Sequence, residues 1–230
     1  MSTEFCALAV IATLFVFSII SLYKKLLNAE GILVANIFGL ATYLIGGFYA
    51  FVTLVVFFAV AEFATKIGRQ VKGVEHEKRS VANIIGNGLP ALVALALHLP
   101  LGFYAGISAA LSDTMSSEIG MCSKHKPRLI TDLKKEVDCG TDGGVTILGL
   151  FAGLLGAALI GIMYFLFFDA QNKLLNFGII TVCGLFGCII DSLLGAIFEL
   201  KGKLNNTQVN LLGSTSGILL AVVMMALLQS

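Results

Sequence analysis

Long apolar runs separated by short polar segments dominate the chain. The runs cover residues 5–23, 31–47, 48–65, 80–97, 99–115, 144–168, 174–198 and 208–228. An α-helix needs roughly 20 apolar residues to cross a bilayer, and most of these runs approach that length. They are continuous rather than alternating, which favours helices over a membrane β-barrel. The pattern therefore predicts an all-α, polytopic transmembrane helical bundle of about eight spans, within a range of seven to nine.

Two of the runs leave alternatives open. The second and third are joined only by Gly46 and Gly47, which predicts either a tight hairpin or one re-entrant segment. The fifth is short and begins beside Pro100, so it either crosses fully or stops inside the bilayer. The first run has no basic segment before it and carries Glu4, so we interpret it as a retained span rather than a cleaved signal.

Composition supports a single integral membrane domain over residues 1–230. Hydrophobic residues make up 57% of the chain and charged residues 13%, against about 25% charged in soluble domains. The mean hydropathy is +0.94. A water-soluble core of this length could not cover so much apolar surface, whereas lipid solvates it. Nothing in the composition suggests binding to nucleic acid.

Positive charge is distributed asymmetrically along the predicted topology. Of the 15 basic residues, all but Lys173 follow an odd-numbered span. These residues are Lys24, Lys25, Lys66, Arg69, Lys72, Lys78, Arg79, Lys124, Lys126, Arg128, Lys134, Lys135, Lys201 and Lys203. Because basic loops stay in the cytoplasm, these loops are predicted to be cytoplasmic and both termini extracytoplasmic.

Polar residues within the spans gather at one predicted depth, near the cytoplasmic side. They are Glu62, Asn83, Asn87, Asp113, Glu118, Asp191, Asn210 and Ser214. Amides and hydroxyls often do no more than join helices by hydrogen bonds. That explanation does not account for carboxylates at the same depth, because charges inside a membrane are costly and usually functional. We therefore predict one polar site at the cytoplasmic interface.

The longest loop carries a second group of candidate residues, and we treat residues 113–143 as a cytoplasmic functional loop. Asp113, Glu118 and Asp191 offer oxygen ligands of the kind that Mg²⁺ prefers. Glycine-rich turns before a helix can bind phosphate through backbone N–H groups, although many are only turns. The candidate phosphate-binding residues here are Gly140, Thr141, Gly143, Gly144, Lys124 and Arg128. The candidate substrate-binding residues are Asn83, Asn87, Ser117 and Asn210.

The same segments resemble the motifs of a known family. Residues 112–120, 140–146, 187–195 and 209–213 are similar, in this order, to motifs of the phytyl-phosphate kinase family, and residues 79–90 also fit its pattern. The resemblance extends from about Gly31 to the end of the chain. It implies a multi-pass membrane kinase that transfers a phosphoryl group from a nucleoside triphosphate, CTP or another, to an isoprenyl monophosphate. The compact loops suggest a prokaryotic, archaeal cell membrane with the active site facing the cytoplasm.

Under this hypothesis Asp113, Glu118 and Asp191 bind Mg²⁺ and act in catalysis, while the amides orient the substrate. The expected partners are an isoprenoid lipid monophosphate, a nucleotide and membrane lipid. Whether the chain forms a homo-oligomer is left open. A secondary transporter of an ion or small solute is the main alternative, because buried carboxylates and glycine-broken helices also mark transport pathways. A non-enzymatic lipid-binding protein is the third. The transporter predicts polar residues near the midplane, whereas these lie near one face.

Overall fold

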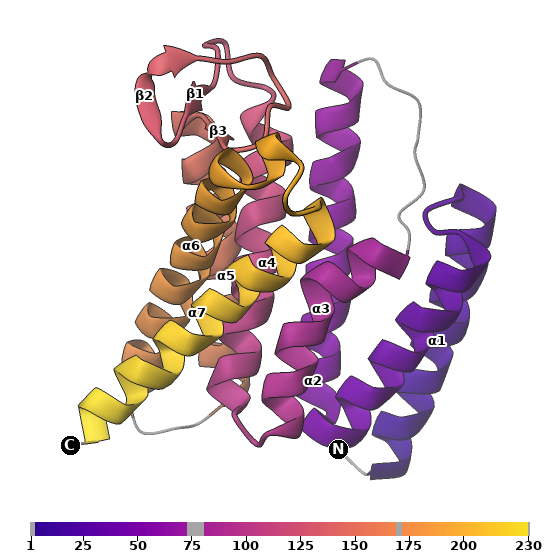
Figure 1. Ribbon diagram of the computed structural model, residues 1–230. Helices are drawn as coiled ribbons and strands as arrows, with labels where there is room; N and C mark the ends of the chain where they lie inside the picture. The colour runs from indigo at the N-terminus through magenta and orange to yellow at the C-terminus, as the bar shows by residue number, and fades with distance from the viewer. Residues whose placement is uncertain (1–2, 73–80, 169–171, 230) are drawn as a thin grey trace.

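The fold is a bundle of antiparallel helices, seen in a computed structural model that describes residues 3–72, 81–168 and 172–229 (Figure 1). The helices are α1 (Thr3–Lys24), α2 (Ala29–Lys72), α3 (Val81–Ala96), α4 (Pro100–Gly120), α5 (Ile147–Phe167), α6 (Lys173–Ile197) and α7 (Asn206–Gln229). A 3₁₀ turn, η1 (Glu199–Lys201), follows α6. The labelled ends of the chain lie at the same end of the bundle (Figure 1). Each helix begins within three residues of the start of an apolar run, and all but α2 and α4 also end within one residue of its end.

Helix α2 consists of two arms that fold back on each other at Gly47. This glycine has φ +77° and ψ −172°, a backbone conformation that L side chains rarely adopt. A Cβ placed on Gly39 would lie 3.4 Å from the ring of Phe51. In a straight helix these residues would be about 18 Å apart, at 1.5 Å per residue. The chain therefore reverses at Gly47, which agrees with the predicted hairpin.

Within the described residues, five helices are long and apolar enough to cross a membrane: α1, α2, α5, α6 and α7. Helix α3 is a shorter apolar helix. Helix α5, with 21 residues, extends about 31 Å, close to the thickness of a bilayer core. These helices carry many exposed large apolar side chains, such as Leu8, Leu44 and Leu166. The outer surface of the bundle is thus suited to lipid.

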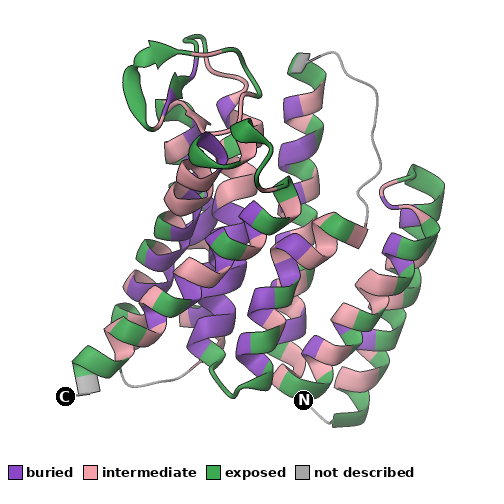
Figure 2. Ribbon diagram, viewed as in Figure 1, coloured by how far each residue is buried: buried purple, intermediate pink, exposed green. Residues whose placement is uncertain are grey.

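Helix α4 differs from its neighbours because it lies at the centre of the bundle (Figure 2). Every residue from Leu101 to Ser112 is buried, and α4 packs against α2, α3, α5, α6 and α7. Small residues such as Gly106 and Ala109 let the neighbouring helices approach closely. A helix enclosed by other helices does not need to be strongly apolar. This position explains how α4 carries serines and acidic residues within the bundle.

The segment after α4 departs from the predicted all-α fold. Helix α4 continues to Gly120, so the predicted loop of residues 113–143 begins instead as about two more helical turns. A three-stranded antiparallel sheet follows, built from β1 (Arg128–Leu129), β2 (Asp132–Glu136) and β3 (Gly144–Val145) in the order β2-β1-β3. Strand β2 is exposed along its whole length and has no apolar alternation. It therefore gave no strand signal in the sequence.

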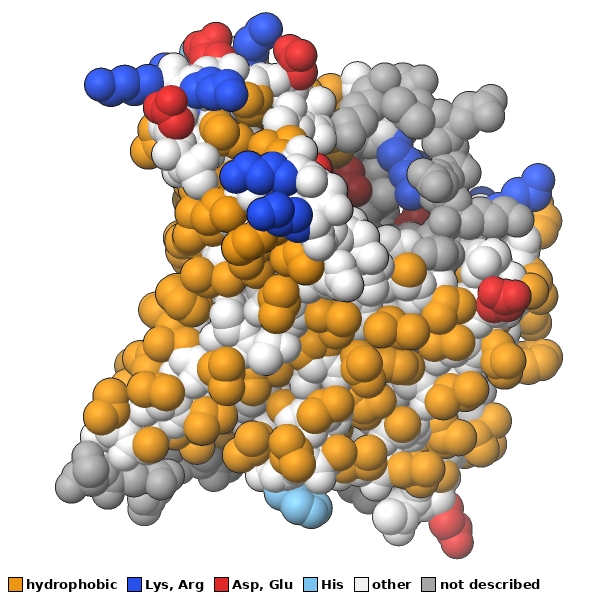
Figure 3. Space-filling model, viewed as in Figure 1, with side chains coloured by type: hydrophobic (Ala, Val, Ile, Leu, Met, Phe, Trp, Pro, Cys, Tyr) orange, Lys and Arg blue, Asp and Glu red, His pale blue; other side chains and the backbone are white. Residues whose placement is uncertain are grey.

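Charged and apolar surfaces are separated along the bundle. Figure 3 shows a broad apolar band with basic and acidic side chains gathered over the sheet and the adjoining helix ends. The sheet lies at the end of the bundle opposite the chain termini (Figure 1). The predicted charge asymmetry also involves Lys78, Arg79 and the side chain of Lys72, which lie outside the described residues.

Candidate functional site

A polar cavity of about 620 Å³ opens at the charged end of the bundle. It lies where α4 and α6 end, where α3 and α7 begin, and beneath the loop that leads into β3. The sequence predicts thirteen site residues, and eleven of them line this cavity. They are Asn83, Asn87, Asp113, Ser117, Glu118, Gly140, Thr141, Gly143, Gly144, Asp191 and Asn210. Residues more than 100 positions apart thus meet in one cavity.

The carboxyl groups of Asp113 and Asp191 form the deepest acidic feature of this cavity. They are hydrogen-bonded to each other, one from α4 and the other from α6. Glu118 and Glu199 lie close enough to act electrostatically on Asp113. Two carboxylates in contact repel each other unless a proton or a cation lies between them. The pair is therefore suited to bind a cation.

Glycines at helix crossings fix the position of this pair. A Cβ on Gly213 of α7 would lie 2.9 Å from the Cβ of Asp191, and one on Gly187 of α6 would lie 2.9 Å from the carbonyl oxygen of Gly213. A Cβ on Gly187 would also lie 2.5 Å from the Cβ of Ala109 in α4. Helices α4, α6 and α7 therefore meet almost backbone to backbone next to the carboxyl pair.

Glu118 lies on another wall of the cavity, against the second arm of α2. That arm passes the end of α4 so closely at Gly68 that a Cβ there would collide with the Glu118 side chain. Among the described residues, no group of three or more His, Cys, Asp or Glu side chains is arranged to hold a metal ion. Asp113 and Asp191 would thus provide two oxygen ligands, and the other ligands would have to come from substrate or water. Mg²⁺ is commonly bound in this way, by one or two carboxylates and by phosphate oxygens.

The glycine-rich turn rests on the end of α6. Gly140 and Gly143 have φ values of +86° and +73°. A Cβ on Gly143 would lie 2.5 Å from the Cβ of Ala196, so only glycine fits between the turn and the helix. The N–H of Gly144 donates to the carbonyl of Thr141 over 2.9 Å. The turn is therefore a close-packed wall of the cavity.

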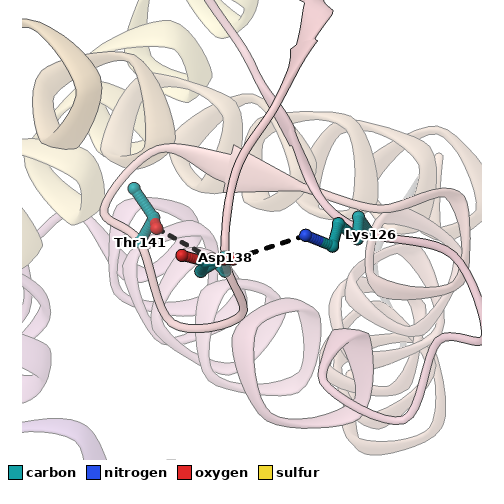
Figure 4. Close-up of polar contacts among 3 residues, drawn as sticks. All are labelled: Lys126, Asp138 and Thr141. Atoms are coloured by element: carbon teal, nitrogen blue, oxygen red, sulfur yellow. Dashed lines mark hydrogen bonds and ion pairs between the residues drawn. The ribbon is translucent and has the colours of Figure 1, made fainter.

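Hydrogen bonds hold this turn in place on its outer side (Figure 4). The Thr141 hydroxyl donates to the carbonyl of Asp138 over 2.8 Å, and the Asp138 carboxylate pairs with Lys126 at 3.6 Å. Thr146 caps α5 by accepting from the N–H of Gly149 over 2.9 Å. The cap and the turn together position the beginning of α5 beside the end of α4.

Amide side chains line the opposite wall. Asn87 donates to the carbonyl of Asn83 over 3.0 Å, and Asn210 donates to the side chain of Asn206 over 3.4 Å. Helices α3 and α7 meet at Gly86, where a Cβ would lie 3.3 Å from the Cβ of Asn210. The two amide pairs, on different helices, therefore face the same cavity.

Two of the nominated residues do not line the cavity. Lys124 lies in the exposed segment after α4, and Arg128, also exposed, uses its guanidinium to donate to the carbonyl of Leu133 over 3.2 Å. The cation that does line the cavity within the described ranges is Arg69, near the end of α2. In the sequence Arg69 served only as a topology signal, because nothing linked it to residues 40 or more positions away.

Several further lining residues were not among the candidates. They are Thr65, Arg69, Thr114, Ser116, Asp142, Thr146, Ser192, Glu199, Asn206 and Thr207, with Gly120, Met121, Pro127 and Gly195. Most are neighbours of nominated residues: Asp142 lies inside the glycine-rich turn, and Asn206 lies one helical turn before Asn210. Helical spacing could have identified Asn206, whereas Glu199 depends on the path of η1.

An apolar cavity of about 110 Å³ adjoins the polar one. It lies between α1, both arms of α2, and α3, and its walls are mainly Phe and Leu side chains. Asn83 and Asn87 line both cavities, so the two meet at the beginning of α3.

Comparison of the amino-acid sequence with known proteins places this chain in a family. The model of a family described as integral membrane protein DUF92 matches residues 12–218, which is most of the chain. The chain belongs to the DUF92 family. An uncharacterized membrane protein of Methanocaldococcus jannaschii is 38% identical over 209 residues, which cover 86% of each chain. No solved structure matches.

The chain is also similar to proteins of Synechocystis and Arabidopsis thaliana. An uncharacterized membrane protein of Synechocystis is 29% identical over 86% of this chain and 83% of its own length. Protein VTE6, a chloroplastic protein of Arabidopsis thaliana, is 27% identical over 86% of this chain and 65% of its own length. The sequence resemblance to the phytyl-phosphate kinase family is thereby confirmed at the level of the family.

Proposed function

We propose that this DUF92 protein is a membrane-embedded kinase that transfers a phosphoryl group from a nucleoside triphosphate, CTP or another, to an isoprenyl monophosphate. The observation that carries the proposal is the polar cavity itself. It collects the four family motifs at one end of an apolar bundle, next to a carboxyl pair and a glycine-rich turn. This is the depth at which the phosphate of a membrane-embedded lipid would lie.

The reaction requires little covalent chemistry from the protein. An oxygen of the lipid phosphate attacks the γ-phosphorus, a new P–O bond forms, and the bond to the bridging β-γ oxygen breaks. The products are an isoprenyl diphosphate and a nucleoside diphosphate. The nucleophile is already anionic, so no strong general base is needed. The protein has to align two phosphates in line and reduce their repulsion.

The charges of the cavity support a requirement for Mg²⁺. Within the described residues five carboxylates line the cavity, from Asp113, Glu118, Asp142, Asp191 and Glu199, against one cation from Arg69. Such an acidic cavity would repel two phosphate-bearing substrates. Bound Mg²⁺ would neutralise phosphate charge, with Asp113 and Asp191 as its protein ligands and with substrate or water oxygens as the others. Arg69 would contact phosphate oxygens directly, a role that suits its planar guanidinium.

The remaining residues would position the substrates. The turn from Gly140 to Gly144 would present backbone N–H groups to the nucleotide phosphates. Asn83, Asn87 and Asn210 would orient the lipid phosphate, and Ser117 would donate to a phosphate oxygen. Lys124 and Arg128, on the outer side of the sheet, would contribute only a general positive field over the opening.

The same proposal includes the orientation of the protein. With α2 reversing at Gly47, the chain would cross the membrane eight times, with both termini outside and the cavity at the cytoplasmic face. The basic residues at the cavity end support this orientation. The membrane would be that of a prokaryotic, archaeal cell. The relatives from Methanocaldococcus and Synechocystis support a prokaryotic membrane.

The test is a direct assay on the purified chain. The protein in detergent or liposomes is incubated with prenyl monophosphates, Mg²⁺ and each nucleoside triphosphate in turn, and products are separated by chromatography. We expect prenyl diphosphate and nucleoside diphosphate in equal amounts, with no product in EDTA. The kinase proposal would be wrong if the folded protein formed no diphosphate with any tail or nucleotide. Uptake of a labelled solute into liposomes by the same protein would favour a transporter.

A further inference from the structure

The apolar cavity adjoining the site is walled by large apolar side chains from three helices. Leu14 and Phe17 come from α1, Phe38 from the first arm of α2, and Phe51, Phe57 and Phe58 from the second arm. Phe17 and Phe58 meet edge to face, with ring centroids 4.9 Å apart, and so join α1 to α2 across the cavity. Its polar lining is confined mainly to Asn83 and Asn87 at one end and Thr13.

The cavity continues the polar one toward the interior of the membrane. On the second arm of α2, Thr65 lines the polar cavity, whereas Phe58 and Phe51 line the apolar one. From Thr65 to Phe51 the arm rises about 21 Å, at 1.5 Å per residue. Along this arm the lining therefore changes from Arg69 and Thr65 to phenyl rings, and Asn83 and Asn87 of α3 line both cavities. A ligand that follows this path must have a phosphate at one end and a single apolar chain at the other.

We propose that this cavity, between α1, α2 and α3, binds the isoprenoid chain of the lipid monophosphate and sets the chain length that the protein accepts. The inference rests on the proposed function and adds the specificity-determining surface. A cavity of about 110 Å³ that meets the polar one at Asn83 and Asn87 suits one tail rather than the two tails of a bulk membrane lipid. Its rings and branched side chains offer dispersion contacts to the methyl branches of an isoprenoid.

Close helix contacts limit the width of the cavity. A Cβ on Gly88 of α3 would lie 3.0 Å from the nearest ring carbon of Phe38, and one on Gly39 would lie 2.8 Å from a methyl of Leu14. The Phe38 ring thus lies between α3 and the first arm of α2, where its size limits the width of the apolar cavity. Ala35, one helical turn earlier, lines the same cavity and leaves room beside it.

The decisive experiment changes the size of these two side chains. Ala35→Trp and Ala35→Leu should narrow the cavity, and Phe38→Ala should widen it. Turnover is measured with dimethylallyl, geranyl, farnesyl, geranylgeranyl and phytyl monophosphates. For the Ala35 variants we expect kcat/KM for the longest accepted tail, relative to that for dimethylallyl phosphate, to fall about 10- to 200-fold. Phe38→Ala should shift the preference toward longer tails.

The matched control is Ile37→Trp, on the same arm but 57% exposed on the outer surface. It should leave the ratio of long-tail to short-tail kcat/KM unchanged. An unchanged ratio in both Ala35 variants, with folded protein and full activity on dimethylallyl phosphate, would overturn the tail site while leaving the kinase intact. A wild-type protein inactive on every substrate would instead overturn the proposed function.

A second readout does not depend on turnover. A prenyl monophosphate carrying a diazirine at the end of its tail is photolysed on the wild-type protein, and the labelled peptides are identified by mass spectrometry. We expect labels on residues 13–17, 35–39 or 51–58, and competition by unlabelled prenyl monophosphate. Labels confined to the outer faces of α5, α6 and α7 would contradict the proposal, because they would place the tail in bulk lipid.

Discussion

The two halves of this bundle differ in how tightly their helices pack. In α5 the share of residues buried along its most apolar stretch is 44%, whereas in α1 it is 11%. Helices α5, α6 and α7 pack on α4, and α6 also packs on α5 and α7; these four helices carry the carboxyl pair and most of the glycine contacts. Among the described residues, helix α1 packs mainly against α2, and many of its large apolar side chains are exposed.

The difference matches the demands of two tasks. Aligning phosphates requires ligands fixed to within a fraction of an ångström, which a close-packed half provides. Admitting a long lipid tail requires an element that can move, and local opening is easiest where few buried contacts must break. The close-packed half therefore contains the carboxyl pair of the polar cavity, and the loosely attached α1 forms a wall of the apolar one.

The strongest test of the role of the close-packed half is to remove one member of the carboxyl pair. Asp113→Asn and Asp191→Asn should each lower turnover about 10²- to 10³-fold, since each deletes a charged group fixed at the reacting phosphates. The protein should remain folded, because an amide can keep a hydrogen bond to the remaining carboxyl group. Asp132→Asn, on exposed strand β2, is the control and should behave as wild type. Wild-type rates in both site variants would remove the proposed metal ligands.

The next largest effect should come from the glycine-rich turn. Gly143→Ala introduces a Cβ that would collide with Ala196 at φ +73°, so the turn must shift and turnover should fall by up to about 100-fold. Gly202→Ala is a matched control, because Gly202 has φ +65° but nothing within 4 Å of a new Cβ. Both variants should lose about 1–2 kcal/mol of stability from the left-handed backbone. Equal turnover in the two variants would show that the turn does not shape the site.

A smaller effect should distinguish the cation inside the cavity from those outside it. Arg69→Gln should raise the KM for the nucleotide or the lipid phosphate about 10-fold, in line with the loss of one charge-assisted hydrogen bond. Arg128→Gln and Lys124→Gln should change KM much less, because these side chains do not line the cavity. Steady-state kinetics on the three variants will show which substitution raises KM most. The reverse order would assign phosphate binding to the sheet.

The smallest effect is expected in the loosely packed half. The Asn36 side chain in α2 donates to the Ser18 hydroxyl in α1 over 2.9 Å. Ser18→Ala should lower the stability measured by thermal unfolding by only about 0.6 kcal/mol, the average for such bonds between membrane helices. Activity on dimethylallyl phosphate should be unchanged. Ser108→Ala, where the hydroxyl donates to Ile180 in the close-packed half, provides the comparison and should cost more.

Much of this architecture follows from periodicity and length. The apolar runs agree with the helices to within a few residues, because only uninterrupted helices satisfy backbone polar groups in lipid. The reversal at Gly47 was also readable, since two glycines join two runs that are each long enough to span. The sheet after α4 was not, because its strands are short, exposed and charged. Helix α4 also continued farther than its apolar residues, because packing rather than lipid surrounds it.

The candidate site was predictable in its depth but not in its details. Asp113, Asp191 and Asn210 could be assigned to one level because each lies near the same end of a span. Which cation reaches the cavity could not be predicted: several basic residues follow the same ends of the predicted spans, and only the packing of α2 against α4 directs Arg69 inward. The pairing of Asp113 with Asp191 likewise depends on a helix crossing that no local pattern encodes.

That crossing has a consequence for how the protein tolerates its surroundings. Gly187, Ala109 and Gly213 bring three main chains together, so the gap between the two aspartates is governed by peptide geometry rather than by long, pliable side chains. A thinner or thicker bilayer can tilt these helices only as one block. The spacing of the two carboxyl groups would then be insulated from changes in lipid composition, which a membrane protein meets whenever its host adapts to heat or cold.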